Sequence, residues 1–204
     1  SQMMVEVLSQ IVEFRNGESG LHVLHIKILT EMLLEGILQR TDQYSLTPET
    51  CQMISIASAF HDIGKIGIDE KILNKPGKLT VEEFAEMKKH TLIGFSMLSK
   101  MERYKDEPLI DIAYQICRWH HERYDGKGYP DGLVGDEIPI SAQIVSLADV
   151  YDALISERAY KKSFTHERAI EMILGGECGI FNPILIECFM EIEQKIKQKM
   201  LEIQ

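Results

Sequence analysis

Apolar side chains recur three or four positions apart through most of the chain, the spacing that places them on one face of an α-helix. Helices are predicted at residues 3–14, 18–39, 48–61, 80–98, 108–121, 139–154, 165–174 and 183–198, with a break near Thr91. Residues 69–80 contain Asn74-Lys75-Pro76-Gly77 and are expected to form turns. Because no useful stretch alternates apolar and polar residues with a period of two, the fold class is predicted to be all-α.

The helical spacing also predicts which side chains face the interior. In the first helix these are Met4, Val7, Leu8, Ile11 and Val12, and in the second they are Leu21, Leu24, Ile28, Met32 and Leu33. In the last helix, Ile192, Ile196 and Met200 form an apolar stripe that could contact a second copy of the chain or pack on its own domain. The pattern leaves these two interpretations open.

Length and composition are those of one soluble globular domain. With 204 residues, of which 45% are hydrophobic and 26% charged, the chain is long enough to build a single core. We therefore interpret residues 1–204 as one domain, with residues 1–14 as a candidate linker helix from an upstream regulatory domain.

Charge and cysteine content narrow the classes of partner and the compartment. The chain has 22 Lys and Arg against 32 Asp and Glu, a formal net charge of −10, whereas binding along DNA or an anionic membrane relies on broad basic patches. Neither DNA nor a membrane is therefore expected as a partner. The four cysteines form no CxxC pair and lie mostly in apolar helical stretches, which favours reduced thiols: Cys51, Cys117, Cys178 and Cys188. With no signal peptide and no apolar run long enough to cross a bilayer, a cytoplasmic location is predicted.

A His-Asp pair followed by a lysine ends the third predicted helix, in the segment His61-Asp62-Ile63-Gly64-Lys65. A histidine nitrogen binds one divalent ion, whereas a carboxylate has two oxygens and can bridge two ions, so an adjacent His and Asp can found a dinuclear metal centre. Gly64 allows a sharp turn, and Lys65 would bring a positive charge to where a phosphate group could bind. Alone, the pair could equally be the polar end of a helix that faces water.

Further histidines and carboxylates recur on other helices. Glu18 and His22 are four residues apart, and His120 and His121 are adjacent at a helix end. Asp149 lies within a strongly apolar helix, where a carboxylate is unfavourable unless it is paired or bound to metal. Each of these residues has an ordinary surface explanation, but eight of them together point to a metal site: Glu18, His22, His61, Asp62, His90, His120, His121 and Asp149.

Other polar residues stand outside this set. Residues 122–138 contain four glycines and a proline, and a loop of this length is usually either functional or disordered; its charges and tyrosines favour an ordered loop. Arg158 and Lys161 face the same way if their segment is helical, although ordinary solvation would explain them as well. His25 and His166 have no partner in this scheme and are interpreted as structural.

Together these motifs resemble the HD-GYP family, a bacterial subset of the HD metal-dependent phosphohydrolases. The resemblance rests on Arg15-x-x-Glu18-x-x-x-His22, on the His61 to Lys65 segment, on His90, and above all on His120 to Pro130, which reads His-His-Glu-Arg-Tyr-Asp-Gly-Lys-Gly-Tyr-Pro. It extends over about residues 14–189. It implies an all-α HD-domain helical bundle with an added GYP loop and C-terminal helices, holding two or three divalent metal ions.

The resemblance implies a phosphodiesterase that hydrolyses cyclic di-GMP to linear pGpG, and in some members to GMP, by attack of metal-activated hydroxide on phosphorus. The eight residues of the set above are the implied metal ligands, and Glu18 is the one associated with a third ion. Asp62 and Lys65 are expected to be catalytic, and the expected substrate-binding residues are Lys65, Tyr129, Arg158 and Lys161. Ligands of histidine and carboxylate without thiolate favour iron, with manganese as the alternative.

Two other functions stay open. Some members of the family cleave 3′,3′-cGAMP, and the residues that choose between guanine and adenine cannot be identified from this sequence. A non-catalytic member would be a cyclic-dinucleotide sensor or adaptor that binds diguanylate cyclase (GGDEF) domains through the GYP loop, an interpretation that the complete ligand set argues against. A homodimer and contact with an upstream regulatory domain are further expectations, and the sequence assigns no general acid.

Overall fold

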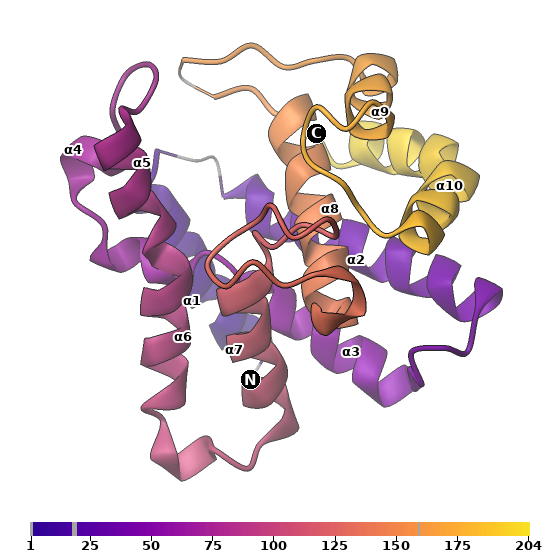
Figure 1. Ribbon diagram of the computed structural model, residues 1–204, viewed down its shortest axis with the longest axis horizontal. Coiled ribbons are helices and arrows are strands. Elements are labelled where there is room, and N and C mark those ends of the chain that lie inside the picture. The colour runs from indigo at the N-terminus through magenta and orange to yellow at the C-terminus, as the bar shows by residue number, and fades with distance from the viewer. Residues whose placement is uncertain (1, 18–19, 159) are drawn as a thin grey trace.

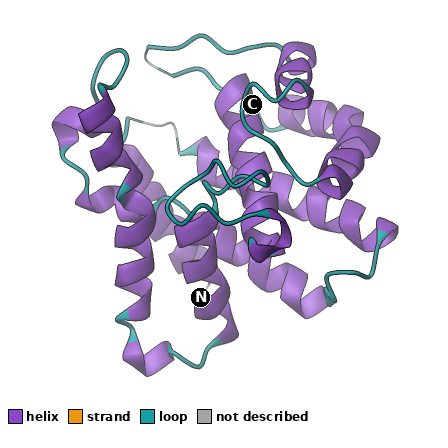
Figure 2. Ribbon diagram, in the orientation of Figure 1, coloured by secondary structure: helices purple, strands orange, loops and turns teal. Residues whose placement is uncertain are grey.

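The computed structural model describes residues 2–17, 20–158 and 160–204. All regular secondary-structure elements within these ranges are helices (Figures 1 and 2). The α-helices are α1 Gln2–Arg15, α2 Leu21–Arg40, α3 Pro48–Ala57, α4 Glu70–Leu73, α5 Val81–Lys88, α6 His90–Ser99, α7 Pro108–Trp119, α8 Ile140–Ile155, α9 His166–Leu174 and α10 Pro183–Glu202. Short 3-10 helices are η1 Ser58–Phe60, η2 Ile63–Gly67, η3 Glu102–Tyr104 and η4 Gly135–Glu137. The predicted all-α fold class is confirmed.

Polar caps set where several of these helices begin. The Thr47 hydroxyl accepts a hydrogen bond from a backbone amide of the first turn of α3, and Pro48 occupies the first helical position. Thr80 and Glu83 form a reciprocal capping box at α5, and the Thr165 hydroxyl caps α9. These starts agree with the predicted ones because a cap depends on residues that are close in sequence.

Other boundaries shift by a few residues. The break predicted near Thr91 falls earlier, because α5 ends at Lys88 and α6 begins at His90. Residues 69–80 contain the single-turn helix α4 as well as turns, and the Asp69 side chain caps it. A helix this short has no apolar periodicity by which the sequence could reveal it.

α2 and α8 form the centre of the domain, with α3, α7 and α10 packed on them and α9 against α8 (Figure 1). The largest fully buried side chains come mainly from these helices: Tyr151, Phe189, Ile26, Leu29, Leu33, Leu34, Ile37, Ile54, Ile116, Ile144, Leu147 and Leu185. Full burial of one such aliphatic side chain contributes about 1.5–3 kcal/mol of transfer free energy. Because α2 and α8 have neighbours on several sides, their sequences are apolar on more than one face.

The inward face predicted for α1 is wrong. Met4, Val7, Leu8 and Ile11 are 69%, 47%, 50% and 61% exposed. Of the five predicted residues, Val12 is buried as expected, and it shares the side of α1 that packs on η1 and η2 with Ser9 and Glu13. Arg15 ties the end of α1 down in this orientation by donating hydrogen bonds to three carbonyl oxygens within residues 65–68. Apolar spacing shows which residues share a face, but these polar contacts are long-range and decide which face meets the domain.

The inward face predicted for α2 is rotated from the observed one. Leu21 and Leu24 are each 39% exposed, whereas Leu33 is buried as predicted. The buried side of α2 consists of His22, Val23, His25, Ile26, Leu29, Thr30, Leu33, Leu34, Gly36 and Ile37. Because apolar residues lie around most of this helix, periodicity alone could not select the side that carries the two histidines.

The apolar stripe of α10 packs within the domain. Ile196 and Met200 are buried, and Ile192 packs against the same core. α10 lies directly on α2, where a Cβ built on Gly36 would meet the Cys188 Cβ at 3.5 Å. The structure therefore favours packing on the chain's own domain over a contact with a second copy.

The four cysteines are free thiols, as predicted. Cys117 is buried, burial raises the pKa of its thiol, and its Sγ donates a hydrogen bond to the Phe60 carbonyl oxygen at 3.0 Å. In the part of the chain that the structure describes, we find no helix with the length and apolar character needed to span a bilayer.

Candidate metal centre

The His61-Asp62 pair lies between η1 and η2, just after α3. η2 packs so closely on α6 that a Cβ at Gly64 would lie 1.8 Å from the His90 carbonyl oxygen, so only glycine fits there. This approach brings the first residue of α6 to the pair. The His90 Nε2 atom lies 3.3 Å from Asp62 Oδ1.

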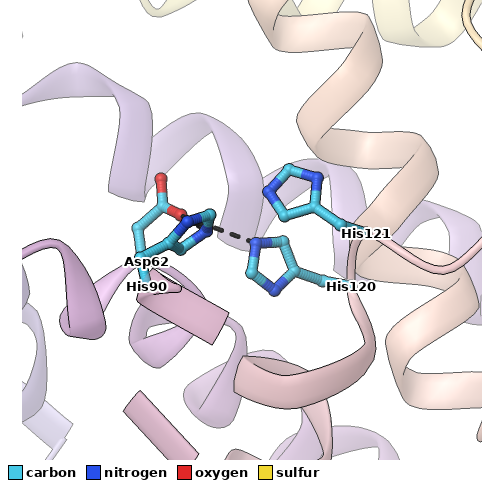
Figure 3. A group of neighbouring side chains, drawn as sticks. All are labelled: Asp62, His90, His120 and His121. Carbon is cyan, nitrogen blue, oxygen red and sulfur yellow. Dashed lines mark ion pairs between the residues drawn. The ribbon is translucent and has the colours of Figure 1, made fainter. Parts of the chain in front are cut away.

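Asp62, His90, His120 and His121 form one group of candidate ligands, called here the His120 cluster (Figure 3). Each residue offers one ligand atom, and these atoms all lie within 4.8 Å of one another. The His120 Nε2 atom is 3.5 Å from Asp62 Oδ1. His120 and His121 immediately follow the last residue of α7, where the helix has ended and two adjacent side chains can turn toward the same centre.

His22, His61 and Asp149 form a second group, called here the His22 cluster. The Nε2 atoms of His22 and His61 are 3.1 Å apart, and Asp149 Oδ1 lies 3.5 Å from the first and 3.8 Å from the second. Asp62 joins the two clusters, because its Oδ2 lies 3.4 Å from His61 Nε2 while its Oδ1 faces the His120 cluster. One carboxylate thus directs one oxygen to each side, as a ligand that bridges two ions would.

Backbone carbonyl oxygens orient three of these histidines. The Nδ1 atom lies 2.8 Å from Ser58 O in His61, 2.7 Å from Met87 O in His90 and 2.9 Å from Ile116 O in His120. A carbonyl can only accept, so each Nδ1 donates its hydrogen and each Nε2 presents a lone pair. Among the described residues, Asp62 Oδ1, His90 Nε2 and His120 Nε2 are buried without a hydrogen-bond partner. Buried acceptors that face one another in this way fit a cation held between them.

The charges of the cluster also suit metal binding. Burial lowers the pKa of His120 and lowers the pKa of His121 well below its usual value. Burial by itself would raise the pKa of Asp62, but the Lys65 ammonium and His61 hold it well below the usual range. Burial would likewise lower the pKa of His61, but the two nearby aspartates raise it. At His120, His121 and Asp62 these shifts favour neutral imidazoles beside an ionised carboxylate, the forms that ligate divalent ions.

The donor set is therefore nitrogen and oxygen without sulfur. Three histidines and the shared Asp62 face one position, and two histidines, Asp149 and the shared Asp62 face the other. First-row divalent ions accept this mixture of ligands, so the residues fit a pair of such ions. The structure brings together seven of the eight predicted ligands, and Glu18 lies outside the described residues.

Two of the predicted substrate-binding residues border the His120 cluster. The Lys65 Nζ atom lies 2.7 Å from Asp62 Oδ2. The Tyr129 ring is stacked on the His121 ring, with centroids 4.8 Å apart and an angle of 16° between the planes. Both side chains are thus in contact with candidate ligands.

Arg158 and Lys161 do not lie in a helix. The prediction that they face the same way applied only to a helical segment. They follow α8, and each backbone amide donates a hydrogen bond to the other's carbonyl oxygen at 3.0 Å. The Lys161 ammonium donates a hydrogen bond to the Ala153 carbonyl oxygen at 2.8 Å. Burial, followed by the nearby Arg158 charge, lowers the pKa of Lys161.

The GYP loop, residues 122–138, is ordered and folds back on its own start. The Glu122 carboxylate accepts hydrogen bonds from the amides of Asp131, Gly132 and Leu133 at 2.6, 3.2 and 3.0 Å. A Cβ on Gly128 would lie 2.4 Å from a backbone nitrogen of the turn beneath it, so the loop needs glycine there. The amide of Tyr129, whose bond to Pro130 is cis, then donates to the His121 carbonyl oxygen at 3.2 Å. This backbone path brings the tyrosine ring onto the histidine.

The sequence prediction missed Asp152, which supports the His22 cluster. This carboxylate is 1% exposed, and its two oxygens each lie 2.6 Å from a histidine Nδ1, Oδ2 from that of His22 and Oδ1 from that of His25. Burial by itself would raise the pKa of Asp152, but the hydrogen bonds from the two histidines lower it. The available signal was a second carboxylate in the apolar helix that carries Asp149. His25, which had no partner in the sequence scheme, therefore has one, whereas His166 contacts Tyr151 and Glu193 and belongs to neither cluster.

Glu13 was missed as well. It is 2% exposed, and its Oε1 lies 3.8 Å from His22 Nε2. No sequence signal identifies it, because the apolar spacing of the first helix assigns the inward side to the opposite face.

Known protein families were compared with this chain. A family model described as HD domain matches residues 20–177, a span that contains both clusters and the GYP loop. The chain belongs to the HD-GYP family.

Relatives of this HD-GYP chain act on cyclic dinucleotides, according to their names. It is 43% identical over 195 residues to a probable cyclic di-GMP phosphodiesterase of Vibrio cholerae serotype O1, an alignment that covers 94% of this chain and 44% of the relative. It is 39% identical over 191 residues to 3′3′-cGAMP-specific phosphodiesterase 2 of the same organism, covering 94% of this chain and 34% of the relative. The chain thus spans less than half the length of these curated relatives.

A solved structure shares the fold. Bd1817, an HD-GYP-type protein from Bdellovibrio bacteriovorus, superposes with a TM-score of 0.62 at 23% sequence identity, covering 85% of this chain and 51% of that one. A likeness at this level of identity concerns the arrangement of the helices, and it agrees with the predicted HD-domain bundle.

Proposed function

We propose that this HD-GYP domain is a metal-dependent phosphodiesterase that hydrolyses cyclic di-GMP to linear pGpG, with GMP as a further product. The observation that carries the proposal is the pair of ligand clusters joined through the two oxygens of Asp62. Two adjacent divalent ions are the arrangement that many phosphoester-cleaving enzymes use. The relatives named for cyclic di-GMP add support for this substrate.

The residues of the chain divide the work of such a reaction. Bound divalent ions would lower the pKa of a coordinated water and offset the charge of the phosphate. Asp62 would hold the two ion positions at a fixed separation, and the Lys65 ammonium, anchored on Asp62 Oδ2 at 2.7 Å, would stabilise negative charge on a non-bridging phosphate oxygen. These roles are the catalytic roles that we assign to the two residues.

Substrate binding would involve groups around the clusters. Tyr129 borders the His120 cluster through its stack on His121, so it is suited to contact the substrate as it enters. We assign Arg158 and Lys161, at the end of the helix that carries Asp149, to the substrate phosphates. The Arg158 charge is near enough to lower the pKa of Lys161, and two neighbouring positive charges suit a phosphate ligand.

Iron is the metal that we favour, with manganese as the alternative. Histidine nitrogen and carboxylate oxygen without thiolate suit both ions better than they suit a structural zinc site. Two ions are proposed for the two described clusters, and a third would require Glu18.

A second substrate is favoured by one comparison. A relative named for 3′,3′-cGAMP is 39% identical to this chain and covers 94% of it, nearly the same span as the cyclic di-GMP relative. Both substrates contain two phosphodiester bonds, so the same metal chemistry would serve either. The bases alone would then decide between them.

We also propose two protein partners. An upstream regulatory domain contacting residues 1–14 is supported by the relatives, which are more than twice as long as the aligned segment, and by the exposed apolar face of α1. Binding of GGDEF domains by the GYP loop would use the exposed part of that loop.

One experiment tests the function and its metals together. The protein is purified without oxygen, its iron and manganese are counted, and it is incubated with cyclic di-GMP or 3′,3′-cGAMP while linear products are followed by chromatography. We expect two or three ions per chain and pGpG as product. Asp62→Ala should lose metal and hydrolysis but keep its helical circular dichroism, and Asp106→Ala, which changes an exposed carboxylate, should behave as wild type. If the protein is fully loaded with metal and binds the nucleotide tightly but forms no product, the proposed enzymatic function is wrong and the protein is a nucleotide receptor.

A further inference from the structure

Asp152 forms a bridge between two histidines that belong to one helix. His22 and His25 are three residues apart on α2, so both project from the same side toward α8. The two oxygens of Asp152 are divided between them, one at 2.6 Å from each Nδ1 atom. The Ser156 hydroxyl adds a hydrogen bond to Oδ1 at 3.0 Å. The carboxylate is thus enclosed by three side-chain donors at the interface of two helices.

His22 differs from the other ligand histidines in what holds its ring. His61, His90 and His120 each donate their Nδ1 hydrogen to a backbone carbonyl oxygen of their own turn. A carbonyl in a helical turn is fixed by the backbone, whereas a carboxylate can rotate about its side-chain bonds. His22 is therefore oriented by a group that must itself be held in place.

His25 is suited to that task, because among the described residues its polar contact is with Asp152 alone. It is 7% exposed, and its Nε2 atom is buried without a hydrogen-bond partner among the described residues. Burying an unpaired polar atom is unfavourable, so an apolar side chain would suit the packing better. The contact that offsets this cost is the hydrogen bond to Asp152.

A donor on the carboxylate also affects the metal side of His22. With Nδ1 donating to Asp152, the Nε2 lone pair points toward His61 and Asp149. A carboxylate behind an imidazole makes the ring a stronger ligand than a carbonyl does, and loss of such a partner typically weakens metal binding by about 10–100-fold.

We propose that Asp152 and His25 are positioning residues that hold His22 in its ligand orientation, so that the ion of the His22 cluster depends on them while the ion of the His120 cluster does not. The inference rests on the proposed metal centre. It predicts that a substitution at His25, which is not a candidate ligand, lowers the affinity of one ion position and not of the other.

The test measures metal binding and not activity. Metal-free protein is dialysed against a series of free Mn²⁺ concentrations, and bound manganese is counted per chain. The wild type should bind at least two ions. His25→Phe keeps a ring of similar size but removes the hydrogen-bond donor. It should lower the affinity for one manganese ion by about 10–100-fold and leave the affinity for the other unchanged. His25→Asn places an amide donor near the original Nδ1 position and should restore binding to within about threefold of wild type.

A matched control separates positioning from general packing. His166 is also a buried histidine. It packs beside α8, and its Nδ1 lies 2.8 Å from the hydroxyl of Tyr151 on that helix. His166→Phe should lower the melting temperature and leave both manganese affinities unchanged. If His25→Phe does not give helical protein, His25→Leu takes its place with the same expected result.

The outcomes are distinguishable. A wild-type chain that binds fewer than two ions would overturn the proposed metal centre, and this inference with it. If the wild type binds at least two ions, the metal centre stands and only the inference can fail. It fails if His25→Phe binds both ions with wild-type affinity, or if this variant loses affinity for both ions equally. It also fails if His25→Asn binds manganese as weakly as His25→Phe does.

Discussion

At Asp62, the two oxygens of one side chain have different surroundings, and this difference organises the whole centre. Oδ1 faces the imidazoles of His90 and His120 at 3.3 and 3.5 Å, whereas Oδ2 faces His61 at 3.4 Å and the Lys65 ammonium at 2.7 Å. A lysine cannot ligate a metal while it carries a proton, so its role at this oxygen is electrostatic. Ligand and charge-stabilising functions are thus separable at neighbouring residues.

This separation gives a prediction for Lys65. Lys65→Ala should keep the full metal content, because no ligand is removed, but should lower kcat by about 10²–10³-fold, the usual loss for one preorganised group that stabilises transition-state charge. Metal counting and initial rates on cyclic di-GMP would measure both quantities. Lys71→Ala, which removes an exposed lysine of the neighbouring helix α4, should change neither. Loss of metal in parallel with activity would show that the role assigned to Lys65 is wrong.

At the scale of elements, the centre depends on how closely backbone segments approach. η2 lies against the start of α6 at Gly64, where an added Cβ would be 1.8 Å from the His90 carbonyl oxygen and 2.6 Å from the Gly94 nitrogen. Between α2 and α8, polar side chains make the contact: His22 and His25 of α2 meet Asp152 of α8. The ligand positions therefore follow from contacts between elements that are far apart in sequence.

Two glycine substitutions test this view. Gly64→Ala should reduce the free energy of unfolding by more than about 3 kcal/mol and impair metal binding, because a backbone clash must push His90 away from Asp62. Gly36→Ala is the matched control: it lies within α2, and its Cβ would make only ordinary contacts, with Cys188 from 3.5 Å and with Ile192 at 4.0 Å. It should stabilise the helix by up to about 1 kcal/mol. Urea unfolding of both variants would measure the difference. Equal midpoints for Gly64→Ala and wild type would contradict the close approach.

For the whole molecule, the clusters join three core helices to the η1–η2 junction and to the start of α6. The seven candidate ligands among the described residues come from α2, the η1–η2 junction, α6, the end of α7 and α8. The core lies mainly among α2, α3, α7, α8 and α10, and it would remain when metal is removed. Metal should therefore add stability to a fold that forms without it.

This arrangement predicts the effect of a chelator. Metal-free protein should keep its helical circular dichroism but melt at a lower temperature. An ion present at about 100 times its dissociation constant adds about 2.7 kcal/mol, which corresponds to a rise of about 5–11 °C in a domain of this size. Thermal melts before chelation, after it, and after addition of Mn²⁺ would measure the shift. A melting temperature that does not respond to metal would mean that the clusters bind no ion in the folded protein.

The sequence by itself determined the helical class, most helix starts and the chemical nature of the site. Helix starts depend on caps such as Thr80 with Glu83, whose partners are three residues apart. The candidate ligands were visible because eight histidines and carboxylates recur together, and because Asp149 lies in an apolar helix, where a carboxylate is unfavourable without a partner. These properties are local, so they can be inferred from neighbouring residues.

Tertiary structure decided which helix faces are buried and which polar groups meet. α1 exposes the apolar side that its spacing predicted to be inward, because contacts of Arg15 with residues 65–68 orient it otherwise. Asp152 reaches His22 and His25 across sequence separations of 130 and 127 residues. Helical periodicity gives the relative positions of residues along one helix, but the pairing of two helices depends on the packing of every neighbour. For that reason the sequence could supply the ligands, whereas the shared position of Asp62 and the support behind His22 required the folded molecule.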